Sequence, residues 1–185
     1  MLRPQFKEFQ DLARGATLVP VVKTVMADLL TPVSAFLSIS AGEQEAFLLE
    51  SVEGGERIGR YTFLGVHPYM ILETRGEEIT MRRGRIVERT TGKLFDVLAM
   101  LLREHQPATL PDLPPFSCGA VGFIAYDAVR QLEKLPEKAR DDLKSPDSFL
   151  MFFDRVLAFD HLRKQIHIIA VADVRKQKPQ QAYET

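Results

Sequence analysis

The sequence lacks the features that mark disulfide-bonded, metal-bound and membrane-spanning proteins. It has one cysteine, Cys118, which excludes an internal disulfide framework and a zinc site built on several cysteines. No apolar run approaches the roughly 20 residues that a membrane-spanning helix needs. Charged residues such as Arg3, Lys7 and Glu8 interrupt the start of the chain, where a secretory signal is apolar. We therefore expect a soluble, cytoplasmic protein that crosses no membrane.

The chain also lacks an excess of charge of one sign. Its 24 Lys and Arg residues nearly balance its 25 Asp and Glu residues, for a formal net charge of −1. No strong field is therefore directed at nucleic acid or an anionic membrane. A local arginine cluster is flanked by glutamates and has no aromatic residues for base stacking, so we interpret it as the charged face of a hairpin. The cluster is Arg82, Arg83, Arg85 and Arg89.

Motifs of the common catalytic and cofactor-binding folds are missing as well. The sequence contains no G-x-S-x-G, no phosphate-binding G-x-x-x-x-G-K-[ST] and no dinucleotide-binding G-x-G-x-x-G. The four histidines are scattered and form no metal-binding pair at helical spacing. We therefore predict no catalytic, cofactor-binding or metal-binding residue in this chain.

Hydrophobic periodicity predicts several helices and strands. The clearest helix spans 92–106, where leucines and Val97 form one apolar stripe. Residues 148–160 and 165–173 are rich in β-formers and are joined by a short polar segment, which predicts a hairpin. Further expected elements are helices near 6–13 and 125–135, a hairpin closed near Arg83-Gly84, and strands over 17–26, 32–40, 45–51 and 119–126.

These patterns favour the α+β class, a mainly antiparallel sheet with a few packed helices. Four prolines between 107 and 115 predict an extended connection in the second half of the chain. We expect one domain over residues 1–173. The polar, unpatterned residues 174–185 are expected to be a linker.

Three stretches, in this order and spacing, resemble the N-terminal domain of anthranilate synthase component I across almost the whole chain. The segment LLES…GERIGRY within 48–61 is the most specific part. Two residues, Cys118 and Phe123, depart from the GGAVGY that is usual in the family. The stretches are TPVSAFLSI (31–39) with FLLESVEGGERIGRYTFLGVHP (47–68), CGAVGFIAYDAVRQLEKLP (118–136) and DDLKSPDSFLMFFDRVLAFDH (141–161).

The resemblance implies a parent enzyme, a lyase that converts chorismate and ammonia to anthranilate and pyruvate in tryptophan biosynthesis. It implies a glutamine amidotransferase subunit, component II, as the source of ammonia. It also implies Mg²⁺, held by a C-terminal chorismate-binding catalytic domain that follows the linker. By this resemblance the 185 residues are the N-terminal scaffold and feedback-regulatory part, and are inactive alone.

The resemblance further implies an effector site for L-tryptophan at Leu49, Glu50, Ser51, Arg60 and Tyr61. An apolar wall at Leu49 suits the indole, and an arginine such as Arg60 suits the effector's carboxylate. Glu50 and Ser51 are adjacent on an expected strand, so their side chains point to opposite faces. We therefore expect one of these two residues to contact the effector through its backbone.

Other interpretations remain open at this point. Glu50 and Ser51 can simply end a strand, Arg60 can be a solvated loop charge, and Tyr61 can lie at the edge of the core. The chain can also be a free-standing amino-acid-binding regulatory module, the matching domain of an aminodeoxychorismate synthase, or a purely structural domain in a relative that tryptophan does not inhibit. Binding of tryptophan by the chain alone distinguishes the free-standing module from the rest.

The first prediction concerns Ser51. In the full-length enzyme, Ser51→Phe fills the effector site and relieves inhibition by tryptophan, while turnover without tryptophan stays nearly unchanged. Allosteric coupling of about 1–3 kcal/mol corresponds to roughly 5–150-fold in affinity. The measurement is a tryptophan titration of both proteins at fixed chorismate. A variant as sensitive as the wild type shows that Ser51 does not line the site.

Overall fold

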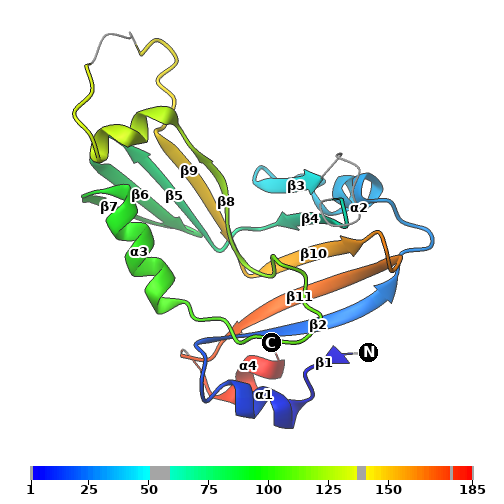
Figure 1. Cartoon of the computed structure of the whole chain (residues 1–185). Helices are drawn as coiled ribbons and strands as arrows, with labels where there is room; N and C mark the ends of the chain where they lie inside the picture. The colour runs from blue at the N-terminus through cyan, green and yellow to red at the C-terminus, as the bar shows by residue number, and fades with distance from the viewer. Residues whose placement is uncertain (1, 51–58, 137–140, 176, 185) are drawn as a thin grey trace. The chain divides into compact units, whose positions relative to one another are not determined.

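The structure is a computed structural model that describes residues 2–50, 59–136, 141–175 and 177–184. It divides into two units (Figure 1). Unit 1 comprises Met1–Pro68, Glu104–Gly119 and Phe153–Thr185, and unit 2 comprises Tyr69–Arg103 and Ala120–Phe152. Within the described ranges, no helix is long and apolar enough to cross a membrane.

Unit 1 is built on a six-stranded antiparallel sheet with the strand order β1-β2-β11-β10-β4-β3. Strands β2 and β11 pair over their full length, from Leu18 opposite Asp173 to Met26 opposite Gln165. Pro20 lies where β1 no longer pairs with β2, so its missing N–H leaves no gap in a ladder. The strands are β1 (Leu2–Arg3), β2 (Leu18–Met26), β3 (Ala46–Glu50), β4 (Tyr61–Val66), β10 (Arg155–Asp160) and β11 (Gln165–Asp173).

Helix α2 (Pro32–Ile39) packs on one face of this sheet, and it corrects the strand that we expected over 32–40. Thr31 is the N-cap: its hydroxyl accepts from the Ser34 N–H (3.1 Å), and the Ser34 hydroxyl accepts from the Thr31 N–H (3.0 Å). This capping box, with proline at the first helical position, starts the helix. Ala35 and Ile39 then point to the sheet, while the alternating pattern that suggested a strand wrongly paired them with Val33 and Leu37, which are exposed.

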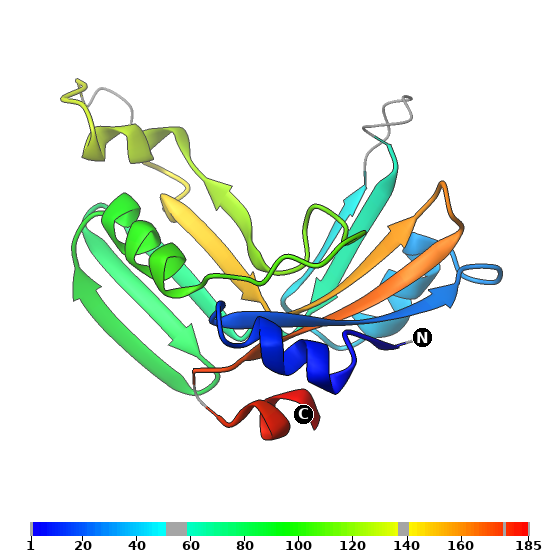
Figure 2. The same ribbon diagram turned by 60° about the horizontal axis from the view of Figure 1, so that its bottom comes forward.

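The two terminal helices pack against each other, as Figure 2 shows. Helix α1 (Phe6–Leu12), which the sequence predicted, buries Phe9 completely. In helix α4 (Pro179–Glu184), the Tyr183 ring lies 5.1 Å from that of Phe9, and its hydroxyl donates to the Pro4 carbonyl (3.0 Å). The segment 174–185, expected as a linker, thus contains a helix packed on unit 1. The boundary between domain and linker stays a prediction.

The proline-rich connection packs on unit 1 through apolar side chains. Leu113 contacts the cluster formed by Val22, Ala158 and Ile169. The Phe116 ring meets that of Phe63 edge-on at a centroid distance of 5.7 Å. The connection that was expected to be extended therefore also buries part of the sheet.

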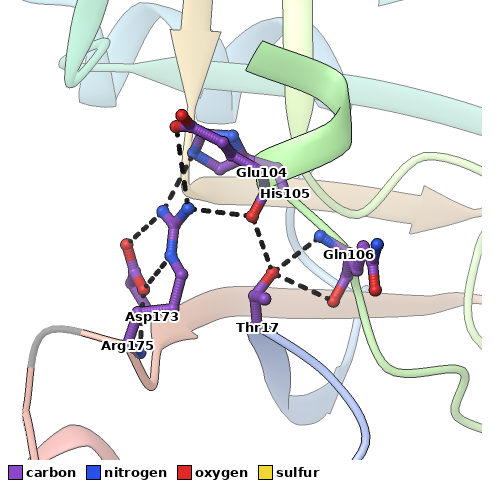
Figure 3. Close-up of polar contacts among 6 residues, drawn as sticks. All are labelled: Thr17, Glu104, His105, Gln106, Asp173 and Arg175. Carbon is purple, nitrogen blue, oxygen red and sulfur yellow. Dashed lines mark hydrogen bonds and ion pairs between the residues drawn. The ribbon is translucent and has the colours of Figure 1, made fainter. Parts of the chain in front are cut away.

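A polar network within unit 1 surrounds Glu104, the last residue of helix α3 (Leu94–Glu104) (Figure 3). The Thr17 hydroxyl donates to the Glu104 carbonyl (3.0 Å) and accepts from the Gln106 N–H (2.7 Å). The Arg175 guanidinium donates to the same Glu104 carbonyl (2.8 Å) and to the Asp173 carboxylate (2.7 Å). The network thus occupies the Glu104 carbonyl, one of the groups that a helix leaves unpaired at its C-terminus.

Unit 2 is a five-stranded antiparallel sheet in the order β7-β6-β5-β9-β8, with α3 packed against it. Leu94 and Leu101 of α3 are buried against Leu72 and Ile79 of the sheet. The remaining elements are β5 (Met70–Arg75), β6 (Glu78–Arg83), β7 (Ile86–Thr91), β8 (Gly119–Ile124), the 3₁₀ helix η1 (Tyr126–Gln131) and β9 (Ser148–Phe153).

The α+β prediction is confirmed, with one further correction. The run 148–160 is not one hairpin strand, because it divides at Asp154 into β9 of one sheet and β10 of the other. The hairpin that remains is β10–β11. Cys118 is not among the residues with positive φ, whereas Gly119 has φ 134°, so cysteine is tolerated at the position where the family usually has glycine.

The second prediction tests the packing of β8. A Cβ at Gly122 would lie 1.9 Å from the Phe149 carbonyl oxygen. Gly122→Ala therefore forces β8 and β9 apart, and we expect a loss of about 1–3 kcal/mol in the free energy of unfolding. The control is Gly15→Ala, where a Cβ meets nothing within 4 Å. Urea denaturation measures both, and equal stability of the two variants contradicts this packing.

Candidate functional site

Four of the five predicted site residues lie at one end of the unit 1 sheet. Strand β3 ends at Glu50 and β4 begins at Tyr61, and the two strands pair with Leu49 opposite Phe63. Figure 1 shows β4 next to β3, and β10 lies on its other side. Ser51 lies outside the described residues, so its predicted role stays a prediction.

Strand alternation places the four residues on both faces of the sheet. Leu49, Phe63 and Tyr61 share one face, and Glu50 points to the other. Leu49 and Tyr61 are diagonal neighbours, a relation that separates residues by roughly 7–8 Å. Leu49 is 47% exposed. The apolar wall expected at Leu49 therefore shares a face with Tyr61 rather than with Glu50.

The Arg60 side chain binds Asp160, the last residue of β10. The Arg60 Nη2 lies 2.6 Å from Asp160 Oδ2, and its Nε donates to both carboxylate oxygens at 3.2 Å. The Asp160 side chain is completely buried, and that of Arg60 is 27% exposed. Arg60 is therefore an oriented cation at the end of the sheet and not a freely moving loop charge.

Asp160 also holds the turn that joins β10 to β11. Its Oδ1 accepts from the backbone N–H groups of Leu162 (3.1 Å) and Arg163 (3.0 Å). Burial alone would raise the pKa of this carboxyl, but the hydrogen bonds from Arg60 and the turn outweigh burial and lower the pKa. Asp160 is therefore ionised at neutral pH and satisfies the turn and the arginine together.

The Tyr61 ring supports the other side of the arginine. The Arg60 Cζ lies 4.8 Å from the centroid of this ring, a cation–π distance. Burial, with a contribution from Asp160, raises the pKa of the Tyr61 phenol, which is therefore neutral at neutral pH. The predicted pair Arg60 and Tyr61 thus forms one fixed unit.

A buried histidine, His167, lies on the same face of the sheet as Phe63 and Tyr61. His167 pairs with Ala158, which also pairs with Phe63, and its Nδ1 lies 3.0 Å from the Thr24 hydroxyl. Burial lowers the pKa of the imidazole, and the Asp160 carboxylate only partly offsets this effect. Sequence reasoning missed both Asp160 and His167, because their partners lie 100 and 143 residues away along the chain.

The described residues show no metal site, and the depression in unit 2 is separate from the predicted site residues. In the described part of the chain, no group of three or more His, Cys, Asp or Glu side chains is arranged to hold a metal ion. An open depression in unit 2 is lined around η1 by charges of both signs, among them Asp127, Arg130 and Lys134. None of the predicted site residues lines it. The chemistry that the site offers is therefore a fixed cation beside an exposed apolar side chain and aromatic rings.

Comparison with known proteins gives the family. A sequence model described as chorismate binding enzyme matches residues 44–185. The chain belongs to this family. It is 40% identical over 95% of its length to anthranilate synthase component 1 of Synechocystis, and 36% identical over 91% to that of Acetivibrio thermocellus. The chain is thus homologous to anthranilate synthase component I.

A solved structure gives the same relation at the level of the fold. The anthranilate synthase component I of Streptococcus pneumoniae matches 86% of the chain with a TM-score of 0.56, at 20% sequence identity. The chain spans about a third of the length of these relatives: 35% of the Synechocystis protein and 34% of the pneumococcal chain. The expected fold is therefore confirmed, and the activity of the whole relatives comes to this chain only as a proposal.

The third prediction concerns pH. Because the pKa of His167 is lowered by folding, the unfolded chain binds more protons once the pH falls below its pKa of about 6.5. Stability from this group is complete above that pH and declines below it, by at most about 1.4 kcal/mol per pH unit. His167→Gln removes the imidazole that takes up this proton in the unfolded chain. We therefore expect a shallower fall in the free energy of unfolding between pH 8 and pH 5, measured by urea denaturation.

The matched control for that experiment is His67→Asn. The His67 side chain is 65% exposed, and its φ of 58° is one that asparagine tolerates. This variant leaves His167 in place, so we expect it to keep the fall in stability that His167 causes. If His167→Gln also keeps it, burial of a neutral His167 is not the source of the acid sensitivity.

Proposed function

We propose that the chain is the N-terminal scaffold and feedback-regulatory part of an anthranilate synthase component I. The observation that carries this proposal is the 40% identity to the Synechocystis component 1 over 95% of the chain. The parent enzyme converts chorismate and ammonia, supplied from glutamine, to anthranilate and pyruvate in tryptophan biosynthesis. It acts in the cytoplasm.

Catalysis in this proposal belongs to another part of the parent protein. A C-terminal chorismate-binding domain of the same protein holds Mg²⁺, and a glutamine amidotransferase subunit, component II, delivers ammonia. The described residues offer no cluster of metal-binding side chains. The role of this chain is to support that domain and to bind the effector.

The effector in this proposal is L-tryptophan. The exposed Leu49 side chain supplies an apolar surface for the indole, and the Arg60 guanidinium supplies donors for the carboxylate. Glu50 or Ser51 accepts a hydrogen bond from the ammonium group. The Tyr61 ring contacts the guanidinium and helps to hold it in place.

Inhibition then follows from differential binding. Tryptophan lowers activity only if it binds the less active arrangement of the parent enzyme more tightly than the active one. A ligand that contacts both this chain and the catalytic domain has such a preference, because only one arrangement presents all of its contacts. The chain alone supplies part of the contacts and therefore binds tryptophan weakly.

The fourth prediction tests this division of roles. The purified 185-residue chain gives no anthranilate from chorismate with either ammonia or glutamine, followed by anthranilate fluorescence. The protein encoded by the complete gene turns over chorismate in the same assay when Mg²⁺ is present, and L-tryptophan inhibits it.

Three outcomes argue against the proposal. Clear turnover by the 185-residue chain places catalysis within it. Tight binding of tryptophan by the chain alone, measured by calorimetry, identifies a free-standing regulatory module instead. A complete protein that forms aminodeoxychorismate rather than anthranilate assigns the chain to that related enzyme.

A further inference from the structure

Among the described residues, the Arg60 guanidinium uses only part of its hydrogen-bonding capacity. Its side edge, formed by Nε and Nη2, binds Asp160. A guanidinium has five N–H donors, and the end formed by Nη1 and the second N–H of Nη2 binds no other group among the described residues. This free end has the two parallel donors that bind a carboxylate in bidentate fashion.

A second arginine in unit 1 shows what a purely structural pair looks like. Arg175 binds Asp173 in the same side-on manner, with Nε to Oδ1 at 2.9 Å and Nη2 to Oδ2 at 2.7 Å. Its Nη1, however, donates to the Glu104 carbonyl at 2.8 Å, as Figure 3 shows. Arg175 is thus occupied at both edges, whereas Arg60 is occupied at one.

Arg60 is also held in place on several sides. Its backbone carbonyl accepts from the His161 N–H (2.9 Å), so the main chain continues the pairing of β4 with β10. Tyr61 lies against the guanidinium, and Asp160 is completely buried and anchored by the turn. A ligand that meets such a fixed arginine does not have to immobilise a flexible side chain first.

The charge of Asp160 works against simple attraction of an anion. The carboxylate neutralises Arg60 and weakens its long-range pull on a second carboxylate. The arrangement therefore favours a ligand whose carboxylate can accept both N–H bonds of the free end. A negative charge without that geometry is bound less well.

We propose that Asp160 is a positioning residue that directs the free end of Arg60 toward the carboxylate of the amino-acid effector. The proposal rests on the proposed function, and it adds to it the residue that orients Arg60 toward the carboxylate. It requires that the protein distinguish L-tryptophan from L-tryptophanamide, which keeps the indole and the ammonium but has no carboxylate.

The experiment compares these two ligands in the protein encoded by the complete gene. Affinities of L-tryptophan and L-tryptophanamide are measured by calorimetry for the wild type, Arg60→Gln, Arg60→Lys and Asp160→Asn. Charge-assisted hydrogen bonds predict a wild-type preference for tryptophan of roughly ten- to hundredfold. Arg60→Gln abolishes the preference, and Arg60→Lys, which keeps the charge but not the fork, loses most of it.

Asp160→Asn tests the positioning itself. The asparagine oxygen can still accept from the N–H groups of Leu162 and Arg163. In that orientation the side-chain NH₂ group takes the place of Oδ2 and cannot accept from the Arg60 Nη2. Arg60 loses its anchor, so we expect the preference for tryptophan to fall about as far as in Arg60→Lys. Affinity for the amide stays within about twofold, because its contacts are unchanged.

The control is Asp173→Asn. It breaks the other bidentate Arg–Asp pair, at the opposite end of β11. A general loss of stability from a broken ion pair appears in both Asp variants, whereas the change in ligand preference appears only in Asp160→Asn. Arg60→Gln and Arg60→Lys keep Asp160 and its hydrogen bonds to the turn, so they decide whether Arg60 binds the carboxylate even if Asp160→Asn does not fold.

The outcomes separate the two levels of the proposal. If the wild type binds neither ligand, the effector function fails and the positioning role fails with it. If the wild type prefers tryptophan but the Arg60 variants keep that preference, Arg60 does not read the carboxylate. If the Arg60 variants lose the preference while Asp160→Asn keeps it or binds tryptophan more tightly, Asp160 is only a counter-charge.

Discussion

The buried carboxylate of Asp160 is the interaction on which one end of the larger sheet depends. It ends β10, accepts two backbone N–H groups of the turn that leads to β11, and fixes Arg60 immediately before β4. A completely buried carboxylate without partners would be strongly destabilising. Because all of these groups converge on it, the turn and the start of β4 have one stable arrangement, and Arg60 is oriented as a consequence.

The position of the candidate site follows from this constraint. Strand ends are where the backbone leaves the ladder and side chains become available for ligands, and a rigid sheet fixes them in place. Here the end of β3 supplies Leu49, and the start of β4 supplies Arg60 and Tyr61. The site thus combines an exposed apolar side chain with a fixed cation, which suits an amino acid that has an apolar side chain and a free carboxylate.

Local sequence signals predicted the elements whose pattern is unambiguous. The apolar stripe of α3 and the α1 helix occur where periodicity placed them, and the predicted hairpin of 148–160 with 165–173 is confirmed only for its β10–β11 part. Helix α2 was predicted wrongly, because over eight residues a period of two and a period of 3.6 select overlapping sets of apolar positions. The capping signal Thr31-Pro32 was present in the sequence and, given its full weight, favours the helix.

The sequence by itself determined the fold class, the family and four residues that lie together at one sheet end. It did so because family motifs and β-periodicity are local properties of the chain. Only the tertiary structure decided that Arg60 is paired with Asp160, that Asp160 and His167 are buried, and that Leu49 shares a face with Tyr61. Register and burial depend on strands that are distant in the chain, as with Arg60 and Asp160, which lie 100 residues apart and meet only when β4 pairs with β10.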